Sequence, residues 1–176
     1  MSTVARTPLP TARGRQTQAA IDDAARRVIA RKGILATTVA DIAGEAGRST
    51  ASFYNYYDSK EAMVREWALR FRDEARERAL AATAPGLSNR ERSRQAAAAH
   101  WHTYRNRLAE IISVSQMAMI SPDFAEYWNE ICAFPTELIA SLVNQVQGQG
   151  YCAGSDPQLI AMALVSMFNQ FCYTQL

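Results

Sequence analysis

Apolar residues along this chain recur at steps of three and four, which is the spacing of one face of an α-helix. Between Gln16 and Lys32, for example, Ile21, Ala25 and Val28 fall on a shared face. The sequence lacks the alternating apolar and polar runs that are typical of half-buried strands. The pattern therefore predicts an all-α protein.

Start and stop signals divide the chain into helices of very different length. Gly33 ends the first helix, and the Thr38-x-x-Asp41 spacing is a capping pattern that opens a short second one. Pro122 and Pro157 each follow a capping residue, as is common at a first helical position. We expect helices at 16–32, 39–46, 50–56, 60–81, 89–105, 108–120, 122–147 with a bend or break at Pro135, and 157–176.

The charges are unevenly distributed, although the formal net charge is only +2. All 19 Lys and Arg residues lie within residues 1–107, whereas residues 108–176 carry only acidic charges. Such asymmetry indicates one end that meets a polyanion and another end that does not.

Several classes of protein are disfavoured by length and composition. The 176 residues suit one compact domain or a small module fused to a larger one. No apolar run approaches the roughly 18 residues of a membrane span, and residues 1–14 lack a secretory signal. Cys132, Cys152 and Cys172 are an odd, widely spaced set, which favours reduced cysteines in a cytoplasmic protein.

The residues from Thr38 to Tyr56 predict a helix-turn-helix. Gly47 ends the first short helix, and Ser49 is a suitable cap for the second. A recognition helix is short and carries hydrogen-bonding side chains near the end that enters the major groove of DNA. Phe53 and Tyr57 turn the other way by helical spacing, so we expect them in the core.

This region resembles the DNA-binding domain of TetR-family (tetracycline-repressor-like) transcriptional regulators over residues 21–60. The resemblance implies a three-helix DNA-binding domain followed by a helical domain for ligand binding and dimerisation. The matching residues are Ile21, Ala24-Ala25, Gly33, Ala36-Thr37-Thr38-Val39, Asp41-Ile42-Ala43, Ala46-Gly47, Ser49, Phe53-Tyr54, Tyr56-Tyr57 and Ser59-Lys60-Glu61.

The resemblance also implies roles in DNA binding for individual residues. It places phosphate contacts at Thr38, Ser52, Tyr54, Tyr56 and Lys60, and base contacts at Thr50, Ala51 and Asn55. Thr38 and Ser49 are alternatively helix caps and nothing more. Arg48 departs from the family pattern, where an aliphatic residue is usual, and we expect its head in solvent or on a phosphate.

Three segments follow from these assignments. Residues 1–15 form a flexible basic arm in which Arg6, Arg13 and Arg15 lie within reach of DNA. Residues 16–65 form the DNA-binding domain, and residues 66–176 form the regulatory domain. The chain ends at Leu176 without a cap or a charged tail, which suggests a shortened C-terminus because family members often continue further.

Large, soft side chains in the regulatory domain have two interpretations. They are either ordinary core or the lining of a pocket for a small apolar ligand, and the family resemblance favours the pocket. His100, Tyr104, Gln116 and Asn129 are candidates to orient such a ligand. The predicted pocket residues are Trp67, Phe71, Trp101, Tyr104, Met117, Phe124 and Trp128.

The last two helices carry wide apolar faces that the family uses to form dimers. A homodimer also suits a palindromic operator, because two half-sites multiply the specificity of one short helix. The predicted interface residues are Leu138, Leu142, Val146, Leu164, Met167, Phe168 and Phe171.

The sequence thus predicts a DNA-binding transcriptional regulator, a repressor that a small apolar ligand releases from double-stranded DNA. No cofactor, metal or membrane partner is expected, because no metal-ligand spacing, phosphate loop or nucleophile elbow is present. The alternatives are a helical enzyme with an aromatic pocket and a DNA-binding protein that responds to no ligand.

Overall fold

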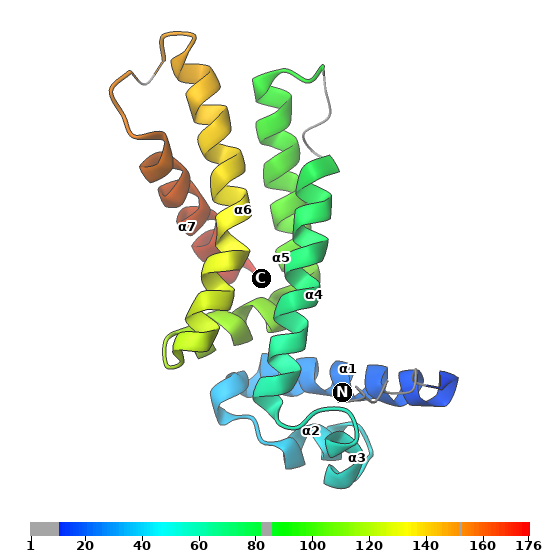
Figure 1. Ribbon diagram of the computed structural model, residues 1–176. Helices are drawn as coiled ribbons and strands as arrows, with labels where there is room; N and C mark the ends of the chain where they lie inside the picture. Colours follow the sequence, from blue (N-terminus) through cyan, green and yellow to red (C-terminus); the bar gives the residue numbers. More distant parts are fainter. Residues whose placement is uncertain (1–10, 82–85, 152) are drawn as a thin grey trace, which may run out of the picture. The chain divides into compact units, whose positions relative to one another are not determined.

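The computed structural model describes residues 11–81, 86–151 and 153–176, apart from the side chains of 75 and 78–81. Within these ranges it forms seven helices and no strand, which confirms the predicted all-α class. The chain divides into two compact units, residues 1–62 and 63–176 (Figure 1). The predicted domain boundary at residue 65 lies just beyond the observed division.

The first unit holds α1 (Ala12–Ala36), α2 (Val39–Glu45), α3 (Thr50–Tyr54) and the first residues of α4 (Lys60–Ala81). The hydroxyl of Thr11 caps α1 by accepting a hydrogen bond from the Gly14 amide at 3.1 Å. Because α1 begins at Ala12, Arg13 and Arg15 lie on a helix and not on the flexible arm that we expected. Arg6 lies outside the described residues.

Two glycines with positive φ set the path of the chain between these helices. Gly33, at φ 74°, interrupts the helical conformation of α1, so the predicted stop is confirmed although one more turn continues to Ala36. Gly47, at φ 64°, makes the turn between α2 and α3. Residues with a Cβ rarely adopt this conformation, which explains glycine at both places.

The predicted inward face of α1 is confirmed, because Ile21, Ala24, Ala25, Val28 and Ile29 are all buried. Further buried residues of the same unit are Ile34, Ile42, Ala43, Phe53 and Tyr57.

The aromatic pair at the end of α3 lies in this core, as the helical spacing predicts. The rings of Phe53 and Tyr57 lie 5.6 Å apart between centroids. The Tyr57 hydroxyl donates a hydrogen bond to Oδ1 of the buried Asp22 at 2.6 Å. This bond compensates the burial of a polar group on α1 and fixes the segment after α3.

The second unit contains the rest of α4 with α5 (Asn89–Ala118), α6 (Pro122–Gln147) and α7 (Pro157–Gln175). Helices α5, α6 and α7 pack against one another (Figure 1). The two helices expected at 89–105 and 108–120 meet at a kink within α5, where Arg107 has non-helical angles of φ −131° and ψ 23°. The Arg107 guanidinium donates to both carboxylate oxygens of Glu74 on α4, at 2.7 and 2.9 Å.

Pro135 does not break α6, so of the expected bend or break the structure excludes the break. The helix runs from Pro122 to Gln147 with Pro135 inside it. The next residue, Thr136, donates its hydroxyl to the Cys132 carbonyl at 2.7 Å, which gives the helix a local side-chain hydrogen bond beside the proline. None of the helices formed by the described residues is long and apolar enough to span a bilayer.

Candidate functional site

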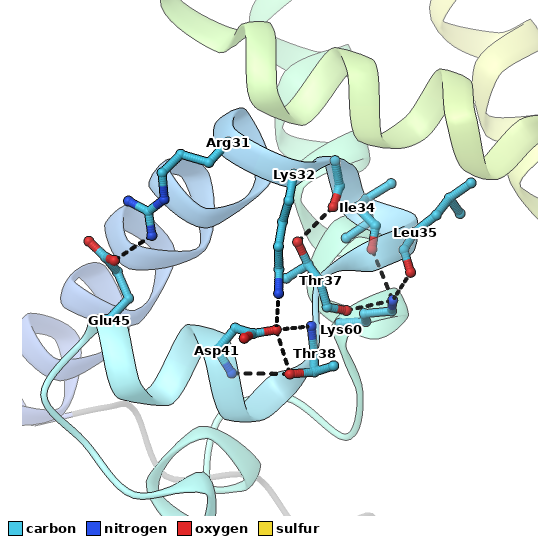
Figure 2. A network of polar contacts seen from close by, with 10 residues as sticks. Arg31, Lys32, Ile34, Leu35, Thr37, Thr38, Asp41, Glu45 and Lys60 are labelled. Atoms are coloured by element: carbon cyan, nitrogen blue, oxygen red, sulfur yellow. Dashed lines mark hydrogen bonds and ion pairs between the residues drawn. The ribbon is translucent and has the colours of Figure 1, made fainter.

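The predicted capping box at the start of α2 is present. The Thr38 hydroxyl accepts a hydrogen bond from the Asp41 amide at 3.2 Å, and the Asp41 carboxylate accepts one from the Thr38 amide at 2.8 Å (Figure 2). The same hydroxyl donates to Asp41 at 2.6 Å. Thr38 is therefore a helix cap, and its hydroxyl proton is already engaged.

Basic residues of α1 hold both carboxylates of α2 (Figure 2). The Lys32 ammonium lies 2.5 Å from Asp41 and, with the Thr38 hydrogen bonds, holds the pKa of that carboxyl well below its usual range. Arg31 and Arg27 bind Glu45 at 2.6 and 2.8 Å and lower its pKa to about 2. These ion pairs fix α2 against α1.

The sequence did not reveal these ion pairs, because their partners lie between nine and 18 residues apart on two different helices. Only the packing of α1 against α2 brings Arg31 close to Glu45. No local spacing rule links such positions, in contrast to the capping box.

Helix α3 begins as the sequence predicts. The Ser49 hydroxyl caps it by accepting a hydrogen bond from the Ser52 amide at 3.2 Å. The turn before it is closed by the Arg48 amide, which donates to the Ala43 carbonyl at 2.9 Å. The Arg48 side chain is exposed, in agreement with a head group that is free to meet solvent or phosphate.

One side of α3 is buried and the other is open. Phe53 is fully buried, whereas Tyr54 is 55% exposed. The predicted contact residues Thr38, Arg48, Ser49, Thr50, Ala51, Tyr54 and Asn55 are exposed, and Ser52, Tyr56 and Lys60 are half-buried. The helix thus presents hydroxyl, amide and phenol groups on a surface anchored by its single buried ring.

Lys60 does not hold the position that we expected of a phosphate ligand. Its Nζ donates to the carbonyl oxygens of Ile34, Leu35 and Thr37, at 2.9, 3.3 and 2.8 Å (Figure 2). An ammonium has three protons, so these three acceptors use all of them. Lys60 instead satisfies the last carbonyls of α1 and ties the start of α4 to the segment before α2.

The second unit contains a cavity of about 810 Å³. Its lining comes from α4, α5, α6 and α7, and it includes an apolar group made of Ile131, Leu138, Leu142, Val146, Leu164 and Phe168. Charged residues also line it, and among them Arg72 pairs with Glu130 at 2.8 Å. The volume lies within the range of small-molecule sites, about 300–1,000 Å³.

The predicted pocket residues divide between this lining and the core. Phe71 and Tyr104 line the cavity, as expected. Trp128 lines a second cavity of about 750 Å³, which also includes Tyr104, Gln116 and Asn129. The other predicted residues line neither cavity: Trp67, Met117 and Phe124 are buried, and Trp101 packs against the core cluster.

Several residues assigned to a dimer interface also line the larger cavity: Leu138, Leu142, Val146, Leu164 and Phe168. Met167 and Phe171 on α7 are instead 55% and 52% exposed. The same helix exposes Leu159 and Met162 and contains no charged residue. The apolar residues of α6 and α7 therefore form both the cavity lining and an exposed surface of α7, and the sequence pattern did not distinguish the two.

No group of three or more His, Cys, Asp or Glu side chains among the described residues is arranged to hold a metal ion. His100 and His102 also differ in burial: His100 is half-buried and lines the larger cavity, whereas His102 is exposed.

Comparisons with known proteins point to regulators. The family model described as bacterial regulatory proteins, tetR family, matches residues 21–67. The HTH-type transcriptional repressor KstR2 of Rhodococcus jostii (strain RHA1) is 40% identical over 77 residues, which is 44% of this chain and 37% of that protein. The chain thus matches little more than a third of this curated relative.

Two solved structures share the fold over most of the chain. A TetR-like transcriptional regulator from Rhodococcus sp. RHA1 is 26% identical, with a TM-score of 0.74 over 94% of this chain and 85% of that one. The ketosteroid transcriptional regulator KstR2 of Mycobacterium tuberculosis is 23% identical, with a TM-score of 0.72 over 90% of this chain and 80% of that one.

The matched proteins are named as regulators and not as enzymes. The family match covers the capped α2, the glycine turn and the exposed α3, and the fold match extends through the cavity-bearing unit. Residues 21–67 thus match the model of the tetR family of bacterial regulatory proteins, and the chain shares its fold with TetR-like regulators.

Proposed function

We propose that this protein is a cytoplasmic transcriptional repressor that binds a palindromic DNA operator as a homodimer. The observation that carries the proposal is α3, on which Phe53 is buried while Tyr54 is 55% exposed. Thr50, Ala51 and Asn55 share the exposed surface and are proposed to contact base edges. The name of the Rhodococcus relative supports repression over activation.

The roles proposed for phosphate contacts follow from exposure. Tyr54 and Arg48 present exposed polar heads, and Ser52 and Tyr56 are half-buried at the edge of the same surface. Lys60 and Thr38 act as caps that hold α2 and α4 in position. Phosphate contacts fix the register of a protein on DNA, whereas base contacts set its sequence preference.

The dimer is proposed to use the uncharged α7. Its exposed apolar residues include Leu159 and Met162, three positions apart, and Met167 and Phe171, four positions apart. Exposed apolar area of this kind marks an interaction surface. Two copies joined there present two α3 helices to successive half-sites.

The cavity of the second unit is proposed to bind a small apolar ligand that releases the operator. Helix α4 carries cavity residues such as Phe71 and begins at Lys60, which holds the carbonyl oxygens before α2. A ligand that displaces α4 therefore acts on the α2–α3 pair through Lys60. One relative is named a ketosteroid regulator, so ketosteroids are the first ligands to test.

Selection from a random duplex library tests the DNA proposal. The purified full chain is mixed with the library, and bound duplexes are amplified and sequenced over several rounds. We expect enrichment of an inverted repeat with half-site centres about one turn of DNA apart, or a multiple of it. No enriched sequence from a folded, dimeric preparation would contradict the proposal.

Release by ligand is tested on the selected duplex. Progesterone, an uncharged ketosteroid, is added to the complex while fluorescence anisotropy reports DNA binding. We expect lower affinity at saturating steroid, and by linkage the steroid binds more weakly to the protein–DNA complex than to free protein. A steroid that binds the cavity without changing DNA affinity would rule out the coupling.

A further inference from the structure

The polar groups at the larger cavity that have no hydrogen-bond partner among the described residues include the buried Nε2 of His100 and the hydroxyl of Tyr104. Tyr104 on α5 is only 5% exposed and lines the cavity. Its Oη forms no hydrogen bond with any described residue, and this oxygen keeps some accessible surface. The small surface that Tyr104 retains therefore includes its hydroxyl, and the residue lies at the boundary of both cavities.

The phenol is held in place by its neighbours. The ring of His100 stacks on that of Tyr104, with centroids 4.8 Å apart and planes 26° apart. His100 in turn lies 5.8 Å from the ring of Phe168 on α7. The hydroxyl is thus presented by a ring whose position is fixed on one face by an aromatic stack.

The part of the cavity wall formed by Tyr104 and His100 is uncharged near neutral pH. Burial raises the pKa of the Tyr104 phenol, so it keeps its proton and remains a hydrogen-bond donor. Burial also lowers the pKa of His100, which favours the neutral imidazole. A charged ligand group next to this pair would lose its hydration without gaining an opposite charge.

The charged residues of the lining do not favour an anion. Arg72 is paired with Glu130 at 2.8 Å and with Asp73 at 3.1 Å. The lining also contains Arg76, whose guanidinium lies 5.8 Å from the ring of Phe134, and Glu137. Acidic residues thus slightly outnumber the basic ones in the lining, so no net positive charge is available to attract an anionic ligand.

The second cavity shares Tyr104 but has a different wall. Its lining includes nine further side chains with amide or hydroxyl groups, among them Ser115, Gln116, Asn129, Gln158, Ser166 and Gln170. The wall of the larger cavity carries the apolar group from Ile131 to Phe168 described above. A mostly hydrocarbon molecule is therefore better matched to the larger cavity.

We propose that the larger cavity binds an uncharged, mostly hydrocarbon molecule whose carbonyl oxygen accepts a hydrogen bond from the Tyr104 hydroxyl. The carbonyl completes the hydrogen bonding of a buried donor, and the hydrocarbon fills the apolar remainder of the cavity. This inference rests on the proposed function, since it names the ligand class of the same regulatory site.

Displacement of a fluorescent probe tests the proposal. N-phenyl-1-naphthylamine, a neutral apolar dye, is bound to the full chain and displaced by 2-dodecanone or by 1-dodecene, which lacks the carbonyl. The variants are Tyr104→Phe and, as a matched control outside both cavities, Tyr127→Phe. The affinity of each ligand is compared between wild type and variant, so the free energy of dehydrating that ligand is the same for both proteins.

The ketone is expected to bind wild type about tenfold more tightly than Tyr104→Phe, with 1-dodecene unchanged and Tyr127→Phe like wild type. Equal ketone binding by wild type and Tyr104→Phe, with the dye still bound, overturns this inference and leaves the proposed function standing. Failure of the dye and both ligands to bind wild type overturns both. Dodecanoate binding more tightly than the ketone overturns the uncharged class.

The infrared carbonyl stretch of bound, isotope-labelled 2-dodecanone gives a readout that does not depend on the variant being folded. In the wild-type protein we expect a shift to lower frequency than in hexane, because a donated hydrogen bond weakens the carbonyl bond. A bound ketone with the frequency found in hexane overturns the proposal.

Discussion

The Nζ of Lys60, the first residue of α4, lies 2.8 Å from the carbonyl oxygen of Thr37, the residue that ends α1. Thr37 directly precedes Thr38, the cap of α2. The start of the long helix is thereby attached to the entrance of the helix-turn-helix. Lys60 acts as a structural cation whose partners are backbone carbonyls.

Replacing Lys60 by Met should lower the free energy of unfolding by about 2 kcal/mol, because three carbonyls lose a charged donor at a site where the lysine side chain is only 19% exposed. Urea denaturation measures this, with Arg65→Met on the exposed side of α4 as the control. The salt dependence of operator binding separates the two roles of Lys60. If Lys60 binds a phosphate, its removal reduces the slope of log affinity against log salt concentration by about 1. If Lys60 is only a structural cation, its removal leaves that slope unchanged.

The two glycines around the end of α2 should respond to alanine in opposite directions. Gly47→Ala should destabilise the protein by about 1 kcal/mol, since φ is 64° there and an added Cβ meets nothing within 4 Å. Gly44→Ala, inside α2 and equally free of neighbours, should stabilise it by about 0.5–1 kcal/mol. Chemical denaturation of both variants measures the pair. Destabilisation by both changes would show that the Cβ is rejected by packing and not by backbone conformation.

Acid should weaken the link between α1 and α2. The folded pKa of Glu45 is about 2, below its ordinary value of 4.5, and that of Asp41 is also lowered. The unfolded chain therefore binds more protons, and the stabilisation from Glu45 is complete above pH 4.5 and is lost as the pH falls toward 2.

Melting temperatures of wild type and Glu45→Gln between pH 6 and pH 3 test this. We expect wild type to melt at the higher temperature at pH 6, and the difference to shrink with acid. Glu126→Gln, on α6, is the control because Glu126 forms no ion pair with any described residue. A difference that grows toward low pH would contradict the assignment.

The contact between α4 and the interruption in α5 should be measurable as a coupling energy. Arg107 binds both oxygens of Glu74, and the two side chains are 31% and 35% exposed. A double-mutant cycle of Arg107→Met and Glu74→Gln should give a coupling of about 0.5–1 kcal/mol. The more exposed Arg94–Glu91 pair, three residues apart on α5, should give a smaller coupling. Equal couplings would show that contact with both carboxylate oxygens of Glu74 adds nothing.

Local signals made much of the first unit predictable. The box of Thr38 and Asp41, the turn at Gly47 and the cap at Ser49 each depend on residues within a few positions of one another. The inward direction of Phe53 follows from helical spacing alone. The early start of α1 at Ala12 was missed because Thr11 is a cap without a following apolar stripe.

The assignment of surfaces in the second unit was less predictable. Leu142 and Phe168 were assigned to a dimer interface but line the cavity, and Trp101 was assigned to the pocket but packs in the core. All three lie at apolar positions of long helices, and the helical spacing is the same for core, cavity and interface residues. Only the packing of four helices separates cavity, core and exposed face. The carbonyl partners of Lys60 could not be predicted for a similar reason, since they lie 23 to 26 residues away.

The central claim, that α3 reads DNA, is tested most directly by comparing affinities for the selected duplex and for a scrambled one. Wild type, Asn55→Ala, Tyr54→Phe and the control Tyr151→Phe, in the loop after α6, are titrated at one fixed salt concentration. Asn55→Ala should reduce the preference for the selected duplex about tenfold or more, as expected for a lost base contact. Tyr54→Phe should weaken both duplexes alike, because a phosphate contact carries no sequence information. If both variants keep the wild-type affinity for the selected duplex and the wild-type preference over the scrambled one, α3 does not read DNA.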